Sequence, residues 1–176
     1  MSDFTNICVD VETLSTRPDA VIVAIGAVKF NFNNDKTETF KVNINPRDGK
    51  RLGLHISKDT LDWWRKQKPE AINAWQHSQI DLEDALAQFS AFCGEANYIK
   101  FWSNGTHFDY PILESSYNAI GKVAPWRYWN VHELRTAYLL GGLDVNTEDR
   151  VGTYHDAVDD CLTEIKWLKK AVGQHD

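Results

Sequence analysis

The first third of the chain alternates apolar runs with turns, in the manner of β-strands. Residues 5–11 form a short run that we expect to be buried on both faces, and residues 20–30 are rich in valine and isoleucine. Residues 37–44 alternate apolar and polar side chains, which is typical of a strand with one solvated face. Residues 33–35 favour a turn between the last two runs. The pattern therefore predicts three consecutive strands, of which the second and third form a hairpin.

Helical spacing dominates the rest of the chain. Ser57 is a candidate N-cap of a first short helix, and Pro69 suits the first position of a second. Asp81 is a candidate N-cap of a third helix, whose apolar residues recur at helical spacing until Gly94 ends it. Five later elements are predicted by the same rules, namely helices through residues 112–120, 131–140 and 157–172 and short strands at residues 98–102 and 127–130.

The order of these elements indicates a fold class. Three strands in a meander, followed by strands that alternate with helices, predict an α/β fold with a mixed sheet of about five strands flanked by helices. A length of 176 residues fits one compact domain. Because the chain has no internal repeat, low-complexity segment or linker, residues 1–176 are predicted to form a single domain.

Composition narrows the surroundings in which such a domain works. Cys8, Cys93 and Cys161 are odd in number and widely spaced, so we expect buried free thiols in a reducing compartment. The longest apolar run, residues 20–28, has the length of a strand and falls well short of a membrane span. No basic segment followed by an apolar one opens the chain, as it would in a signal peptide. These features predict a cytoplasmic protein that does not associate with membranes.

The charge of the chain disfavours one way of binding nucleic acid. A net charge of −6 argues against wrapping of long nucleic acid by phosphate neutralisation. It is compatible with an enzyme that grips a few nucleotides at one end, where bound metal ions supply positive charge. Residues 41–70 hold eight Lys or Arg against four Asp or Glu, a balance of +4 that leaves −10 for the remainder. Two interpretations stay open for Lys50, Arg51, Arg65, Lys66 and Lys68 of this segment, which would either contact phosphates of the substrate or form an ordinary solvated, charged face.

Four carboxylates and one histidine form three short blocks with a shared chemistry. Asp10 directly follows the first apolar run and Glu12 lies two residues further on, and side chains at this spacing on a strand point to the same face. Asp109 lies in mid-chain, and His155 and Asp160 lie near the end. Two Mg²⁺ ions require hard oxygen ligands, and a histidine suits proton transfer near neutral pH. Together the blocks predict metal-dependent cleavage of phosphodiester bonds.

The same residues also have simpler interpretations. Asp156, Asp159 and Asp160 lie in the first turn of the last predicted helix, where acids stabilise its positive end, and we expect the first two to be capping and solvated acids. Asp109 lies at a predicted helix start and resembles an N-cap. His155 would lie about 140° from Asp160 around a continuous helix, so we expect it on the preceding loop.

Other residues with functional chemistry lie close to the blocks. His107 adjoins the mid-chain block, but a lone exposed histidine beside an aromatic residue is expected to be incidental. Trp63, Trp64 and Trp102 would either stack on bases or supply core area. Seven Trp in a small domain favour the core for most of them.

The acidic blocks carry a family resemblance. Asp10, Glu12, Asp109 and Asp160, with His155 five residues before the last, resemble the DEDDh exonucleases, which are 3′–5′ exonucleases of the ribonuclease H-like fold. Matches outside these residues resemble a narrower branch that contains phage-type exonuclease A and a mycobacterial-type 3′–5′ exoribonuclease. These matches include Thr13, Pro18, Ser57, Thr60, Trp63, Trp64, Pro69, Phe108, Pro111, Trp129 and Arg135. The similarity covers about residues 5–172, nearly the whole chain.

The resemblance implies a set of site residues and cofactors. One Mg²⁺ would be held by Asp10, Glu12 and Asp160, and a second by Asp10 with Asp109 directly or through water. Mn²⁺ is expected to substitute, and His155 would deprotonate the attacking water. By the same resemblance, the substrate would be contacted by residues Thr13, Leu14 and Phe108.

The implied activity is removal of nucleoside monophosphates from nucleic-acid 3′ ends. The resembling branch contains both RNA and DNA enzymes, so single-stranded ends or short overhangs of either are expected, and a homodimer is compatible with the family. Two positions depart from the wider family, because Ser15 replaces a frequent glycine and Asn104 lies five residues before Asp109 instead of four.

Two other classes of protein compete with the exonuclease. A catalytically silent nucleic-acid-binding module would lack one of the acidic residues or His155, and none is missing. A structural partner protein would use the acids only as helix caps, and tight binding of Mn²⁺ would exclude it.

Overall fold

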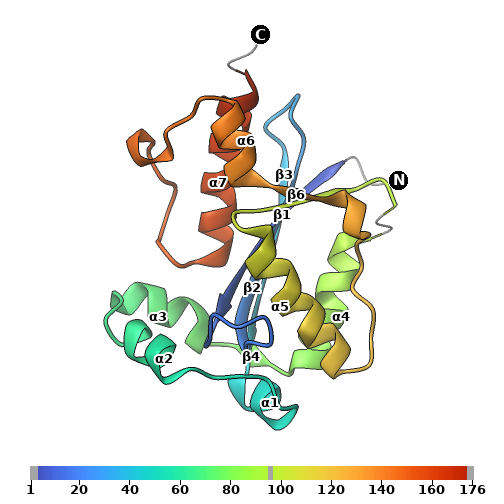
Figure 1. The fold of residues 1–176 in the computed structure, drawn as a ribbon, viewed down its shortest axis with the longest axis vertical. Helices are drawn as coiled ribbons and strands as arrows, with labels where there is room; N and C mark the ends of the chain where they lie inside the picture. Colours follow the sequence, from blue (N-terminus) through green and yellow to red (C-terminus); the bar gives the residue numbers. More distant parts are fainter. Residues whose placement is uncertain (1–3, 95–96, 174–176) are drawn as a thin grey trace.

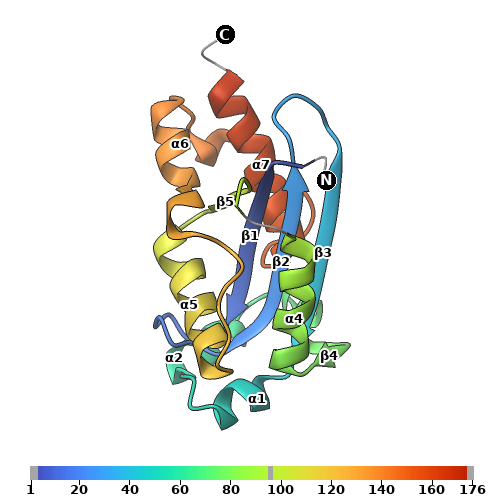
Figure 2. The ribbon, with the colours of Figure 1, turned by 90° about the vertical axis from the view of Figure 1, so that its right-hand side faces the viewer.

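The computed structural model describes residues 4–94 and 97–173, which form a sheet with helices on both faces (Figures 1 and 2). The strands are β1 (Asn6–Thr13), β2 (Ile22–Phe30), β3 (Thr37–Ile44), β4 (Gln79–Ile80), β5 (Lys100–Ser103) and β6 (Val131–Glu133). The α-helices are α1 (Pro46–Arg51), α2 (Lys58–Trp64), α3 (Pro69–Gln76), α4 (Leu82–Cys93), α5 (Thr106–Ala119), α6 (Leu134–Leu140) and α7 (Ala157–Gly173). No helix in these two ranges is long and apolar enough to cross a membrane.

The six strands lie in the order β4-β3-β2-β1-β5-β6. β1, β2 and β3 form an antiparallel meander, whereas β5 runs parallel to β1 and β6 runs parallel to β5. β1 is central in the sheet and helices cover both of its faces, which explains why its first residues are continuously apolar.

Successive residues of β1 pack against different layers of helices. Ile7 and Val9 belong to a core that includes Phe89 of α4 and Ile112 of α5. Cys8 belongs to a second core with α6 and α7. Figure 1 shows the sheet between these two pairs of helices. Because side chains alternate along a strand, the even-numbered residues of β1 point toward α7.

A third core closes the end of the sheet at which β1 stops. It contains Leu14, Val21, Trp64 and Trp75, so it joins the end of β1 to α2 and α3. Figure 1 shows α1, α2 and α3 gathered at this end. This third core places α2 beside the last residues of β1.

A glycine allows α7 to begin very close to the sheet. A Cβ atom on Gly26 of β2 would lie 2.4 Å from the carbonyl carbon of Ala157, the first residue of α7. No side chain fits in that space, so glycine is required for this close approach. Gly26 pairs with Asp10 in the antiparallel register, and the start of α7 therefore lies beside Asp10.

Several expectations from the sequence are confirmed. The third strand has the expected bounds, and Ser57 caps α2 by accepting a hydrogen bond from the Thr60 N–H at 3.5 Å. Pro69 is the first residue of α3, and Gly94 ends α4 in the left-handed region with φ 69°. Asp81 has the N-cap position of α4, although its side chain makes no capping hydrogen bond.

Other expectations were wrong, and the errors concern short elements. The mixed sheet of about five strands is confirmed, with six in the described residues, but the two-residue β4 that pairs with β3 was not expected. Residues 127–130 were expected to be a strand, but Tyr128–Asn130 is a 3-10 helix and the strand is β6. The next helix therefore begins at Leu134, capped by Glu133, instead of at residue 131. Strands this short are fixed by pairing with a neighbour, which periodicity does not record.

Candidate active site

The five residues of the acidic blocks meet at one cleft, although they come from four parts of the chain. Asp10 and Glu12 lie on β1, and Asp109 lies in the first turn of α5. Asp160 lies in the first turn of α7, and His155 lies on the preceding loop. All five line a cleft of about 540 Å³. The structure thus brings together every residue that the sequence assigned to catalysis.

The two carboxylates of β1 lie in a crowded, acidic environment. Small residues oppose them, because Asp10 pairs with Gly26 and Glu12 with Ala24. Burial raises the pKa of Asp10 well above its usual value, and the charge of Glu12 raises it further. Burial likewise raises the pKa of Glu12, and the charge of Asp160 raises it further. The repulsion among these groups would be relieved by bound cations.

Asp109 is held against the end of β1 and is not an N-cap. Gly105 is the N-cap of α5, and its φ of 124° explains the glycine at this position. Asp109 is buried and accepts a hydrogen bond from the backbone N–H of Val11 at 3.3 Å. Burial raises the pKa of its carboxyl to about 7. The alternative that Asp109 only caps a helix is therefore wrong.

Asp160 interacts with the backbone of His155 and with the side chain of Arg150. Its carboxylate accepts the backbone N–H of His155 at 3.2 Å and also pairs with Arg150. Burial raises the pKa of Asp160 to about 6, and Arg150 opposes that effect. Burial, and then the charge of Arg150, lower the pKa of the His155 imidazole, which is half-buried. A lowered pKa favours the neutral imidazole, which is the form that a general base requires.

Three ligand atoms in the cleft are close enough to share one ion. A carboxylate oxygen of Glu12, a ring nitrogen of His155 and a carboxylate oxygen of Asp160 all lie within 4.8 Å of one another. Carboxylate oxygens are the hard ligands that Mg²⁺ and Mn²⁺ prefer. The donor set of the cleft therefore fits such cations.

The neighbouring acids and the second histidine lie outside the cleft lining. Asp156 pairs with Lys41 at 2.5 Å and accepts the N–H of Val158 at 3.1 Å, so it caps α7 as expected. Asp159 accepts the N–H of Thr153 at 2.7 Å and thereby fixes the loop before α7. His107 is exposed on α5 and does not line the cleft.

The three residues expected to contact substrate have different positions. Thr13 and the half-buried Phe108 line the cleft. Leu14 is only 4% exposed, packs in the third core and does not line the cleft. Contact of Leu14 with a terminal base therefore remains a prediction that this arrangement does not support.

Additional residues line the cleft, and of these the sequence had offered only the two tryptophans, as candidates for base stacking. The additional residues are Val11, Thr16, Ser57, Asp59, Thr60, Trp63, Trp64 and Asn104. Ser57, Thr60 and Trp63 belong to a motif that carried the family resemblance, so a signal for them was present. The two tryptophans differ, because Trp63 is 42% exposed whereas Trp64 is 4% exposed. Adjacent positions on a helix face different directions, and sequence alone did not separate them.

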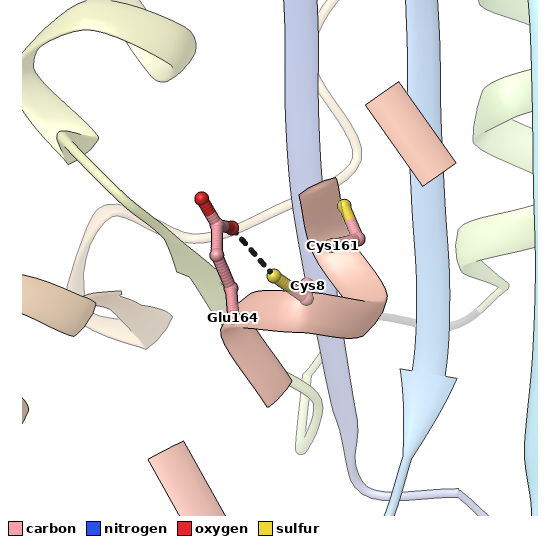
Figure 3. A group of neighbouring side chains, drawn as sticks. All are labelled: Cys8, Cys161 and Glu164. Atoms are coloured by element: carbon pink, nitrogen blue, oxygen red, sulfur yellow. Dashed lines mark hydrogen bonds between the residues drawn. The ribbon is translucent and has the colours of Figure 1, made fainter. Parts of the chain in front are cut away.

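A second group of potential metal ligands lies on β1 and α7, outside the cleft lining. Figure 3 shows Cys8 of β1 with Cys161 and Glu164 of α7. The Cys8 thiol donates to a Glu164 carboxyl oxygen at 3.4 Å, and all three residues are buried. Burial raises the pKa of both Cys161 and Glu164 well above their usual values. The expectation of buried free thiols is confirmed for Cys8, Cys93 and Cys161.

Comparisons with known proteins agree on a class of nuclease. The model of the family described as the 3′–5′ exoribonuclease Rv2179c-like domain matches residues 5–172. The exodeoxyribonuclease of Enterobacteria phage T4 is 27% identical to this chain over an alignment 201 residues long. The alignment covers 93% of this chain and 87% of the phage protein.

Two solved structures have the same fold at low sequence identity. The nuclease domain of 3′hExo, a DEDDh family member bound to rAMP, has a TM-score of 0.63 and 12% identity, covering 98% of this chain and 94% of that one. Pop2p of S. pombe, in a form with Mg²⁺ and Mn²⁺ bound, has a TM-score of 0.60 and 12% identity, covering 95% and 82%. With the family match, these structures confirm the expected α/β fold and the resemblance to DEDDh exonucleases.

Proposed function

Because this chain belongs to the Rv2179c-like family of 3′–5′ exoribonuclease domains, we propose that its cleft removes nucleoside monophosphates stepwise from single-stranded 3′ ends. The chain is a 3′–5′ exonuclease, and the proposal concerns its metal ions, its catalytic residues and its substrate. The observation that carries it is the convergence of Asp10, Glu12, Asp109, His155 and Asp160 on one cleft.

The proposed metal ligands are the four carboxylates. Asp10, Glu12 and Asp160 would hold one Mg²⁺, and Asp10 with Asp109 would hold a second. Two such ions stabilise negative charge on the attacking and leaving oxygens of a phosphodiester. The raised pKa values of these carboxyls support this assignment, because burial raises all four and neighbouring acids add to the shifts of Asp10 and Glu12, both of which a cation would offset.

His155 is the proposed general base. It lines the same cleft as the carboxylates, and its lowered pKa keeps a ring nitrogen free to accept a proton from the attacking water at neutral pH. No residue of the set is missing, which argues against a catalytically silent binding module. Assembly of all five in one cleft argues equally against acids that serve only as helix caps.

The size and lining of the cleft support a single-stranded substrate. A volume of about 540 Å³ accommodates one terminal nucleotide better than a duplex. Phe108 supplies aromatic surface in the lining, and a base can stack on such surface whatever its identity. RNA and DNA both remain substrates in this proposal.

The test is degradation of RNA and DNA strands of one sequence, each labelled at the 5′ end. With Mg²⁺ or Mn²⁺, we expect a ladder that shortens from the 3′ end and releases nucleoside monophosphates, and no cleavage in chelator. Matched strands with a 3′-terminal phosphate test the requirement for a free end. Internal cleavage, or equal rates in chelator, would contradict the proposal, and the ratio of RNA to DNA rates identifies the preferred substrate.

A further inference from the structure

Among the residues that the structure describes, none provides the hydrogen-bond acceptor that usually orients the ring of a catalytic histidine such as His155. Its backbone N–H donates to Asp160, and its φ of 61° lies in the left-handed region although it is not glycine. In the described part of the chain, its imidazole makes no hydrogen bond to a carboxylate or carbonyl. Backbone contacts therefore fix the Cα atom of His155 but leave the direction of its ring to other groups.

Three aromatic rings surround the imidazole of His155. The His155 ring centroid lies 4.9 Å from that of Trp63, with the ring planes at 81°. Trp64 lies 6.0 Å away at 74°, and Tyr154 lies 5.9 Å away at 52°. Perpendicular rings at these separations attract through their opposed edge and face charges. The ring with the shortest separation is Trp63, which also lines the cleft.

Trp63 is itself fixed to the strand that carries Glu12. Its neighbour Trp64 donates from Nε1 to the backbone carbonyl of Thr13 at 2.9 Å, which joins α2 to the end of β1. The rings of Trp63 and Trp64 lie 5.0 Å apart at 74°. A chain of contacts therefore connects β1 through α2 to the imidazole of His155.

We propose that Trp63 is a positioning residue that aims the His155 imidazole into the cleft. This inference rests on the proposed role of His155 as general base. Trp63 would act by restricting rotation of the imidazole, because a misplacement of about 1 Å lowers a rate by as much as about 10²-fold. The competing role for an exposed cleft tryptophan is stacking on the terminal base, which the experiment distinguishes.

The experiment compares Trp63→Leu, Trp63→Phe, His155→Ala and the double variant of Trp63→Leu with His155→Ala. We expect Trp63→Leu to lower kcat on a short strand by about 10-fold to 10²-fold with little change in KM. Trp63→Phe should retain most of the wild-type kcat, because it keeps an aromatic ring beside His155. In the His155→Ala background, Trp63→Leu should have no further effect on kcat. Trp129→Leu, at an exposed position outside the cleft lining, is the matched control.

Two further measurements separate positioning from base stacking. On a strand whose 3′-terminal residue lacks a base, the loss caused by Trp63→Leu should persist. In the chelated enzyme, NMR should show a shift of the His155 ring protons in Trp63→Leu that is absent in Trp129→Leu, because the ring current of Trp63 is removed.

Several outcomes would overturn the inference. They are additive losses in the double variant, an effect confined to KM, disappearance of the loss on the strand without a terminal base, or unchanged ring-proton shifts. If His155→Ala were itself harmless, the proposed general base would be wrong, which is a separate failure from that of Trp63.

Discussion

Two groups of potential metal ligands lie on β1 and around the start of α7, and their surroundings are opposite. Glu12, His155 and Asp160 line the cleft, with hard oxygen atoms beside a half-buried imidazole. Cys8, Cys161 and Glu164 lie behind them and are sealed between the sheet and the helix. In each group the potential ligand atoms lie within 4.8 Å of one another, so proximity alone does not define a cation site.

Access to solvent separates the two groups. A cation reaches the cleft from solvent, whereas the two thiols of the second group lie within the core formed by β1, α6 and α7. Burial raises the pKa values of Cys161 and Glu164, as it does those of Glu12 and Asp160, but only the cleft lets a cation replace the proton. We conclude that the first group suits Mg²⁺ and that the second behaves as neutral, hydrogen-bonded core.

The largest effect is expected from the cleft carboxylates. Asp10→Asn or Asp160→Asn should abolish Mg²⁺-dependent cleavage, because each removes a charge that the ions require. Both variants should stay folded, since the amide has the size of the carboxyl and removes like-charge repulsion. Rates from end-labelled strands and circular dichroism spectra measure the two properties. A near-native rate in either variant would remove that residue from the site.

His155→Ala should have the next largest effect. We expect turnover to fall by roughly 10²-fold to 10⁴-fold with little change in Mn²⁺ affinity, because the histidine transfers a proton and is not a proposed ligand. In the wild type, the rate should rise with pH as the imidazole loses its proton. Because its pKa is lowered, the midpoint of this rise should lie below the usual pKa of a histidine. Equal damage from the control His107→Ala would contradict the choice of histidine.

Removing a buried charge from the chelated protein should change its pH dependence of stability. The pKa values of Asp109 and Asp160 are raised to about 7 and about 6, so the folded state binds protons that the unfolded state releases. The free energy of unfolding should therefore decrease as pH rises from the usual carboxyl range toward 7, and Mg²⁺ should oppose that decrease.

Asp109→Asn should flatten this profile and raise Tm in chelator at neutral pH. We expect a few degrees, since 1 kcal/mol corresponds to about 2–4 °C in a domain of this size. Thermal unfolding measured from pH 4 to 8 checks the result, with Glu83→Gln, at an exposed position on α4, as the charge-matched control. A variant with an unchanged profile would mean that Asp109 carries no buried charge.

The smallest effect is expected from the sealed group. Glu164→Gln replaces a neutral carboxyl by an amide that can still accept from Cys8, so the rate and Tm should stay close to wild type. Cd²⁺ should produce no thiolate charge-transfer absorption in the folded protein and a clear band after unfolding. A native band that Cys8→Ala removes would show that the sealed group binds metal after all.

Local patterns determined the parts of the molecule that depend on near neighbours. Two-residue spacing on a strand gave Asp10 and Glu12 a common face, and angular spacing on a helix excluded His155 from the turn that contains Asp160. Capping residues such as Ser57 and Pro69 fixed helix starts to within a residue. In each case a few adjacent backbone hydrogen bonds or side-chain directions decide the outcome, and the sequence records them directly.

Only the tertiary structure decided the rest. Cys8 and Glu164 are 156 positions apart, and their contact follows from α7 packing on β1, which no local pattern encodes. Packing likewise buried Leu14 and Trp64 while leaving Trp63 at the cleft. The short β4 and β6 exist because neighbouring strands supply hydrogen-bond partners. Burial and pairing between distant segments depend on the whole fold, so the sequence identified the chemistry of the site and the packing decided which side chains surround it.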